Sequence, residues 1–363
     1  MDDKEKQEKK EAAGKAGDGA GAGDAAKAAG SKPAAGPKPR PKPKAPPAVE
    51  GLVVSSSPHL LGVDSVPKIM HTVVMALLPV VGTAMVIFGV KAIVLVAVCV
   101  GACLATEHIC CRLGGKPSTI ADGSAIITGM LLALTLPPDF PLLGAVLGSV
   151  FAIAVGKQIF GGLGLNIFNP ALLGRAFLQA TYPVLITTWT EPLGRGAPDA
   201  VSAATPLALM KFEATMTARA DMFVGTVAGS LGETSALAIL IGGLFLRYKG
   251  YINWRLPLGY LGSMAFFGGV FWLIDPARYP DPLFHVLAGG AMLAAWFMVT
   301  DMVTTPVTPL GQWIFVGVAG FLAVIIRLFG GLPEGVMYSI LLMNATVPLL
   351  NSWTRPRVFG EAR

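Results

Sequence analysis

Apolar stretches recur along residues 66–350 of this chain, and they constrain its fold more than any other feature of the sequence. Most of them are roughly 17–22 residues long, about the length that a helix needs to cross ~30 Å of hydrocarbon. Within a bilayer every backbone N–H and C=O group must find a partner inside the protein, and helices meet this requirement by themselves. The sequence therefore predicts an all-α polytopic membrane protein with about ten transmembrane helices.

Composition supports a membrane protein and argues against nucleic-acid binding. Of the 363 residues, 53% are hydrophobic and only 14% are charged, and the mean hydropathy is +0.63, well above that of ordinary soluble domains. The formal net charge is +6, but the basic residues lie in the N-terminal tail and in short loops. They are not interleaved with aromatic residues in the way that nucleic acid requires. The expected surface partner is therefore membrane lipid and not nucleic acid.

The cysteines indicate neither a disulfide framework nor a metal site. All four fall on one expected helix or at its end, without the CxxC spacing of metal-ligand pairs. An iron–sulfur cluster needs four thiolates, so a cluster here would need a partner subunit. We predict no metal site and expect these side chains to pack in the interior. The residues concerned are Cys99, Cys103, Cys110 and Cys111.

The hydropathy pattern predicts about ten spans, and the third and sixth are short and polar enough to be broken or half-buried helices. If the N-terminal tail is cytoplasmic, most basic loops fall on the cytoplasmic side, in agreement with the positive-inside rule. We therefore predict a multi-pass protein of the bacterial inner membrane with both termini in the cytoplasm. The expected spans are residues 68–88, 91–110, 122–137, 142–159, 166–181, 230–247, 256–274, 284–301, 311–328 and 335–350.

The membrane region also contains an internal repeat. A shift of 169 residues aligns Thr135 with Thr304, and it aligns the Phe-Gly-Gly-Leu run at 160–163 with the same run at 329–332. If each unit has five helices, an odd number, the second must be inserted upside down, as in many transporters. The predicted segments are a disordered Ala/Lys/Pro-rich cytoplasmic tail (1–50), a first membrane repeat (51–181), a periplasmic loop (182–222), a second repeat (223–352) and a cytoplasmic C-terminal tail (353–363).

Glycines and small polar residues gather in two segments, residues 122–129 and 157–170. Glycine permits close backbone approach and breaks in a helix, while Asn, Ser and Thr satisfy freed backbone groups or a polar ligand at membrane depth. Helix packing through small residues explains the same pattern, and Lys157 and Arg175 are long enough to snorkel to an interface. The pattern alone leaves a site and packing both open. The polar candidates are Ser124, Thr128, Asn166 and Asn169.

Two further features carry chemistry. In the long loop between spans, the run from Asp199 through Ser202 to Thr205 places small residues before a threonine. A threonine hydroxyl needs an activating enzyme or base to react, and an ordinary turn explains this run as well. Acidic side chains at Glu233 and Asp301 lie at span ends, where an acid marks an ion pathway or an ion pair. Helix capping or solvation at the interface explains these two acids equally well.

Together with the Ser-Pro-His run at 57–59, these segments resemble the family that contains the D subunit of the Rnf complex and the B subunit of the sodium-pumping NADH:quinone reductase. The resemblance covers nearly everything after Ser55. It implies FMN joined to Thr205 by a phosphoester, with Ser202 and Asp199 positioning the loop for the transfer of the flavin. Ala203 departs from the pattern, because glycine is common at this position. The resemblance also implies a second, noncovalent flavin, riboflavin, for which Ser124, Thr128, Asn166 and Asn169 are the candidate lining residues.

The function that follows is a membrane subunit of an Rnf-type complex. Such a subunit passes electrons through flavin between ferredoxin and NAD, coupled to Na⁺ or H⁺ translocation, with Glu233 and Asp301 as candidates for the ion pathway. It is part of a translocase and is not catalytically complete alone, so no catalytic residue is assigned. The implied partners are the other Rnf subunits (A, B, C, E and G) and a flavin transferase. Two alternatives stay open, the quinone-reducing homologue and a urea or ammonium channel.

Overall fold

The computed structural model describes residues 64–192, 202–233, 235–331 and 333–356. Within these ranges the chain is mainly helical, with one short antiparallel pair of strands, β1 (Trp189–Thr190) and β2 (Ser202–Ala203). This confirms that the fold is mainly helical, as predicted, whereas the short strand pair was not predicted. The tail predicted to be disordered at 1–50 and the candidate Asp199 lie outside the described residues.

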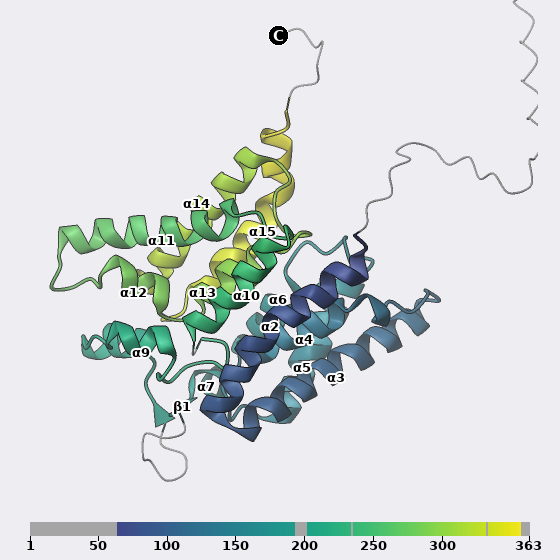
Figure 1. The fold of residues 1–363 in the computed structure, drawn as a ribbon, viewed down its shortest axis with the longest axis horizontal. Helices are drawn as coiled ribbons and strands as arrows, with labels where there is room; N and C mark the ends of the chain where they lie inside the picture. Colours follow the sequence, from purple (N-terminus) through teal and green to yellow (C-terminus); the bar gives the residue numbers. More distant parts are fainter. Residues whose placement is uncertain (1–63, 193–201, 234, 332, 357–363) are drawn as a thin grey trace, which may run out of the picture. The chain divides into compact units, whose positions relative to one another are not determined.

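The first half of the membrane region contains five α-helices, which Figure 1 labels, and one short 3₁₀ turn. Helix α3 packs against both α4 and α5, and α5 packs against α6. A glycine-rich stretch separates η2 from α6. Helix α6 begins at Pro170, and Asn169 caps it. The predicted start of the fifth span at residue 166 is therefore wrong, because the helix starts four residues later. The segments are α2 (Val66–Phe88), α3 (Val90–Leu113), the 3₁₀ turn η1 (Ile120–Asp122), α4 (Ser124–Leu134), α5 (Leu142–Ile153) with its π-helical continuation η2 (Ala154–Gln158), and α6 (Pro170–Thr181).

The loop between the two halves has short elements of its own. Polar contacts join it to neighbouring turns: Asp139 accepts from Lys91 at 2.6 Å and from Thr190 at 2.7 Å, and Arg219 pairs with Asp281 at 2.8 Å. Partial burial disfavours the charged form of Asp139, but these hydrogen bonds hold its pKa below the ordinary value. The elements are α7 (Pro183–Thr187), β1, β2, α8 (Pro206–Ala208), the π-helix η3 (Leu209–Glu213) and α9 (Arg219–Val224).

The second half repeats several packing relations of the first. Helix α11 packs against α14, α14 packs against α15, and α10 packs against α2 of the first half. The elements are α10 (Ala236–Tyr248), α11 (Arg255–Ile274), α12 (Pro282–Leu287), α13 (Ala291–Leu293) with its π-helical continuation η4 (Ala294–Met298), α14 (Pro309–Phe329) and α15 (Val336–Trp353).

Helix lengths separate full spans from half-length helices. Within the described residues, four helices are long and apolar enough to cross a membrane: α2, α3, α11 and α14. Helices α4 and α10 have only 11 and 13 residues, which confirms the prediction that the third and sixth spans are short. A continuous eighth span at 284–301 is wrong, because Ala288 is extended and Gly289 has a φ of +64°. This break separates α12 from α13.

The turn that precedes α10 donates backbone hydrogen bonds to the end of α4, so two half-length helices meet there. The carbonyl oxygens of Leu134 and Leu136, at the end of α4, accept from the N–H groups of Gly232 (2.7 Å) and Leu231 (3.1 Å). A Cβ atom at Gly232 would lie 2.9 Å from the Leu134 carbonyl oxygen, so only glycine permits this approach without a shift. Backbone groups that are freed at the end of one short helix are therefore satisfied by the turn that leads into another.

Candidate functional site

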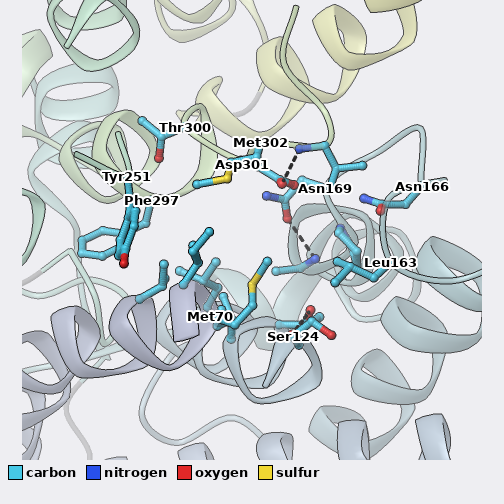
Figure 2. A pocket seen from close by; sticks show the side chains of 18 of the residues that line it. Met70, Ser124, Leu163, Asn166, Asn169, Tyr251, Phe297, Thr300, Asp301 and Met302 are labelled. Atoms are coloured by element: carbon cyan, nitrogen blue, oxygen red, sulfur yellow. Dashed lines mark hydrogen bonds between the residues drawn. The ribbon is translucent and has the colours of Figure 1, made fainter. Parts of the chain in front are cut away.

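A pocket lies among α2, α4, η2, α6, η4 and the turns that follow α10 and η4; we call it the α4 pocket. The space between its side chains is about 830 Å³ with its open side included. Tyr251 and Phe297 lie at one side, and Leu163 and Asn166 lie at the other (Figure 2). The remaining lining is mostly apolar and includes Ile69, Met70, Val73, Ile127, Leu131, Leu246, Ile252 and Met302, with Ser124, Thr128, Lys157, Asn169, Thr300 and Asp301 as its polar members.

All four residues predicted to line an inner site lie in this pocket. Three of them form local hydrogen bonds. Thr128 donates to the Ser124 carbonyl at 3.0 Å, and Asn166 donates to the Phe168 carbonyl at 3.1 Å. The Asn169 side-chain oxygen accepts from two N–H groups at the start of α6. These residues therefore help to shape the walls of the pocket, and their role in holding a flavin stays a prediction.

Lys157 is buried in the wall of the α4 pocket, which excludes the alternative that it snorkels to an interface. Its Nζ atom lies 2.7 Å from Glu107 Oε1 and 2.6 Å from Ser124 Oγ. The side chains of Lys157 and Glu107 are 2% and 0% exposed. Thr119 also donates to Glu107. An ammonium group stays charged at such depth only when a carboxylate compensates it.

Sequence reasoning assigned no role to Glu107. Two features of the sequence could have indicated the pair: Glu107 is the single acid of the mainly apolar α3, and Lys157 lies in a short, mainly apolar helical segment. These two residues are 50 positions apart in the chain, so their pairing depends on how α3 packs against η2. The π-helical geometry of η2 widens the turn that carries Lys157, and such turns are frequent at functional sites.

A second, smaller site contains buried charges; we call it the charged cavity. Arg175 of α6 pairs with Glu334, which precedes α15, so Arg175 does not snorkel either. Arg327 of α14 donates to the carbonyl oxygens of His285 (2.5 Å) and Ala288 (2.8 Å), where the chain breaks between α12 and α13. Glu233 also lines this cavity. Its other lining residues are Thr135, Leu172, Ser230, Gly290, Leu293, Met298, Val336 and Met337.

The two predicted ion-pathway candidates lie in different cavities. Glu233 lines the charged cavity, whereas Asp301 lines the α4 pocket. The Asp301 carboxylate accepts from the Val303 N–H at 3.1 Å and from the Thr304 hydroxyl at 3.2 Å. Asp301 therefore holds the turn after η4, which is the capping alternative left open by the sequence. The structure does not bring Glu233 and Asp301 together.

Thr205 is 4% exposed and stands immediately before α8. Its Oγ1 atom accepts from the Ala208 N–H at 3.2 Å and so caps this short helix. The backbone of Ser202 pairs with Thr190 through the β1–β2 ladder, which fixes the entry to the threonine, while Asp199 lies beyond the described residues.

A pocket adjoins Thr205; we call it the Thr205 pocket. The residues on both sides of the threonine, Ala204 and Pro206, line it, and the space between its side chains is about 630 Å³ with its open side included. The Thr217 hydroxyl is buried and has no hydrogen-bond partner among the described residues. The other lining residues are Glu191, Pro192, Ala203, Leu209, Thr226, Val227 and Ala228.

Comparison with known proteins identifies relatives along nearly the whole chain. The D subunit of a proton-translocating ferredoxin:NAD(+) oxidoreductase complex from Clostridium ljungdahlii is 45% identical over 320 residues, covering 85% of this chain and 96% of the relative. Its counterpart from Acetobacterium woodii, named as Na(+)-translocating, is 48% identical over 317 residues, covering 86% and 96%. The D subunit of an ion-translocating oxidoreductase complex from Stutzerimonas stutzeri is 41% identical over 329 residues, covering 82% and 93%.

The model of the NQR2, RnfD, RnfE family matches residues 53–360. This range includes the segments that line the α4 pocket, the charged cavity and the Thr205 pocket. Since the family model and the relatives each cover most of its length, the chain belongs to the NQR2, RnfD, RnfE family, as the resemblance of its motifs predicted.

Proposed function

We propose that the chain is the membrane-embedded D subunit of an Rnf-type complex, which couples electron transfer between ferredoxin and NAD to the translocation of Na⁺ or H⁺. The observation that carries this proposal is the 45–48% identity, over more than 300 residues, to two proteins named as the D subunits of such complexes. The same names favour this function over the quinone-reducing homologue and over a urea or ammonium channel. The partners would be the other Rnf subunits, A, B, C, E and G.

The proposed topology has about ten spans in two inverted repeats. Under the 169-residue shift, α5 with η2 (Leu142–Gln158) falls within α14, and α6 falls within α15. The matching packing of α5 against α6 and of α14 against α15 supports this arrangement. In the inner membrane, tags after Lys116 and at Arg363 should report the cytoplasm and a tag near Arg195 the periplasm; a cytoplasmic tag near Arg195 would rule this topology out.

Thr205 is the proposed attachment point of FMN. Ester formation removes the hydroxyl hydrogen and leaves Oγ1 as an acceptor, so the bond from the Ala208 N–H can persist after attachment. The adjoining Thr205 pocket supplies space, and the unpartnered Thr217 hydroxyl supplies a polar group inside it. These residues fit a phosphate-anchored flavin, and a flavin transferase would carry out the attachment.

The α4 pocket is the proposed site of a second, noncovalent flavin. Tyr251 and Phe297 offer aromatic faces to a planar ring, and Ser124, Asn166 and Lys157 offer polar groups at the pocket wall. A bound flavin supplies one- and two-electron redox chemistry, while the protein sets its position and its electrostatic surroundings. In this pocket the Lys157–Glu107 pair would set the local charge.

The attachment proposal is tested by Thr205→Val, expressed in the complex together with a flavin transferase. This change keeps the β-branched shape but removes the oxygen, so fluorescent flavin that survives on a denaturing gel in the wild type should vanish. Loss of the helix cap costs about 1 kcal/mol, so the chain should still fold. Thr205→Ser should be modified in part, and Thr217→Val should remain labelled.

Two results would contradict this assignment. Flavin retained by Thr205→Val would show that the attachment residue is another one. An unlabelled wild type, made with the transferase present, would remove the main support for covalent flavin in this chain.

Ion coupling is the remaining part of the proposed function, and Glu233 and Asp301 are its candidate residues. Neutralising either one should slow ion-dependent electron transfer while bound flavin is retained, because each side chain is half-buried where an unpaired charge is costly. Electron transfer and ion pumping at the wild-type rate in both Glu233→Gln and Asp301→Asn would make these residues structural.

A further inference from the structure

The charged cavity brings together groups from six parts of the chain. Thr135 ends α4, Arg175 lies in α6, Glu233 precedes α10, Arg327 lies in α14 and Glu334 precedes α15, with Gly290 at the start of α13. The space accessible to the centres of water molecules is about 30 Å³, and roughly 10–15 Å³ is enough for one water. The cavity therefore has room for water but not for a cofactor.

Most of the charge in this cavity is already compensated. Arg175 and Glu334 form an ion pair, with side chains 5% and 18% exposed. Arg327 is held by two carbonyl oxygens that the break between α12 and α13 leaves without helical partners. Among the ion pairs of the described residues, none includes Glu233, so this carboxylate is the remaining acceptor.

Three buried polar groups of the cavity have no hydrogen-bond partner among the described residues. They are Arg175 Nη1, Arg327 Nε and Ser230 Oγ, and their residues are 4%, 3% and 0% exposed. A buried donor without a partner costs about 1–3 kcal/mol. Three such groups around one small cavity indicate that a polar ligand completes them.

The position of Glu233 is fixed by the backbone around it. A Cβ atom at Gly229 would lie 3.1 Å from one of its carboxylate oxygens, and a Cβ atom at Gly290 would lie 3.3 Å from the other. The carboxylate therefore lies between two turns of the chain, and glycine at both positions leaves room for it. These two turns therefore determine where the Glu233 carboxylate lies relative to the guanidinium groups of the cavity.

We propose that the charged cavity holds water that links the Glu233 carboxylate to Arg175, Arg327 and Ser230, and that this unit exchanges protons and excludes Na⁺. The guanidinium N–H groups without partners are donors, and a donor cannot ligate a sodium ion. Water suits the lining, since it accepts from the guanidinium N–H groups and donates to the carboxylate. This inference rests on the proposed ion coupling and names the ion that this site would take.

The proton step breaks one O–H bond and forms another. A hydronium ion in the cavity gives its proton to the Glu233 carboxylate and leaves a neutral water, and in the return step the carboxylic acid gives the proton back to water and leaves the carboxylate. The charged groups that act on it are Arg175 from α6, Glu334 from the segment before α15, and Arg327 from α14. His285 of α12 contacts the network through its carbonyl oxygen, which accepts from Arg327.

Infrared difference spectroscopy on the purified complex tests this proposal. Exchange between acidic and alkaline buffer should produce a protonated-carboxyl band that shifts in D₂O and is lost in Glu233→Gln, while Asp301→Asn, in the other pocket, should keep it. Raising NaCl in place of choline chloride at constant pH should leave the band unchanged. Ser230→Ala removes one member of the network with little change in volume and should shift the band.

Several outcomes would overturn the proposal. The first is a protonated-carboxyl band that Glu233→Gln retains. The second is a carboxyl band that shifts when NaCl is raised at constant pH. An unchanged band in Ser230→Ala would also overturn it, and this variant keeps the test decisive if Glu233→Gln fails to fold. Covalent flavin is measured on the same samples, so a wild type with the band but without flavin would contradict the flavin assignment alone.

Discussion

The α4 pocket and the charged cavity both lie where helices break, but they manage buried charge differently. The α4 pocket is mainly apolar, and its buried ion pair, Lys157 with Glu107, is almost fully enclosed. The charged cavity is smaller, and its pair, Arg175 with Glu334, leaves the carboxylate 18% exposed. Its guanidinium groups also retain donors that have no partner among the described residues.

This difference indicates different tasks. A larger pocket with a mainly apolar lining suits a planar ligand that is held in place. The charged cavity is small, it contains guanidinium donors without partners among the described residues, and the Glu233 carboxylate belongs to none of their ion pairs. Such a cavity suits water and protons. The comparison can be tested by removing one partner at a time in each site.

The largest effect is expected for Lys157→Met, which leaves the Glu107 carboxylate buried without its cation. Breaking a fully buried pair in this way costs about 3–5 kcal/mol, so the thermal unfolding midpoint of the purified complex should fall strongly. The double variant Lys157→Met/Glu107→Gln removes both charges and should recover most of this loss. A single variant as stable as the wild type would show that water reaches the pair.

A smaller loss is expected for Arg175→Met in the charged cavity. Glu334 is partly exposed and water can solvate it, so the remaining charge is less costly than Glu107 without Lys157. Unfolding midpoints of the two single variants, measured side by side, give the comparison, and Arg175→Lys serves as the control that keeps the charge. An equal fall in the unfolding midpoint for Arg175→Met and Lys157→Met would mean that water reaches neither ion pair. It would contradict the proposed difference between the two sites.

Gly232→Ala tests the turn that forms one wall of the charged cavity. The added Cβ would lie 2.9 Å from atoms of both Leu134 and Leu293, and overpacking of this kind costs about 1–3 kcal/mol. Gly262 in α11 is a matched control, because a Cβ there meets nothing within 4 Å; Gly262→Ala should be neutral or slightly stabilising. A Gly232→Ala variant that unfolds at the same temperature as Gly262→Ala would show that the two loops can separate without cost.

The smallest effect is expected for Asn169→Ala, which removes the cap of α6 in the wall of the α4 pocket. The loss should be about 1 kcal/mol, and Asn169→Asp should retain most of the stability because it keeps an acceptor for the two N–H groups. The carboxyl band proposed for Glu233 should be unchanged in both variants. A changed band would show that the two sites are coupled through α6.

The features that were predicted correctly from the sequence depend on local patterns of residues. Apolar length predicted the helical membrane fold, and low hydropathy at the third and sixth spans correctly predicted the short α4 and α10. Glycine and asparagine patterns selected four residues that all line the α4 pocket. Residue spacing failed at the eighth span, since the break at Ala288 depends on Arg327, which supplies hydrogen bonds from another helix.

The sequence by itself determined the membrane setting, the helical class, the family and four polar residues of the α4 pocket. Hydropathy, helix breakers and ordered motifs are local properties of the chain, and they could be read without the structure. Only the tertiary structure decided which charges meet. Lys157 finds Glu107 across 50 positions and Arg175 finds Glu334 across 159, and Glu233 and Asp301 lie in separate cavities. The physical reason is that a buried charge is stable only beside a compensating group, and helix packing, not distance along the chain, brings that group to it.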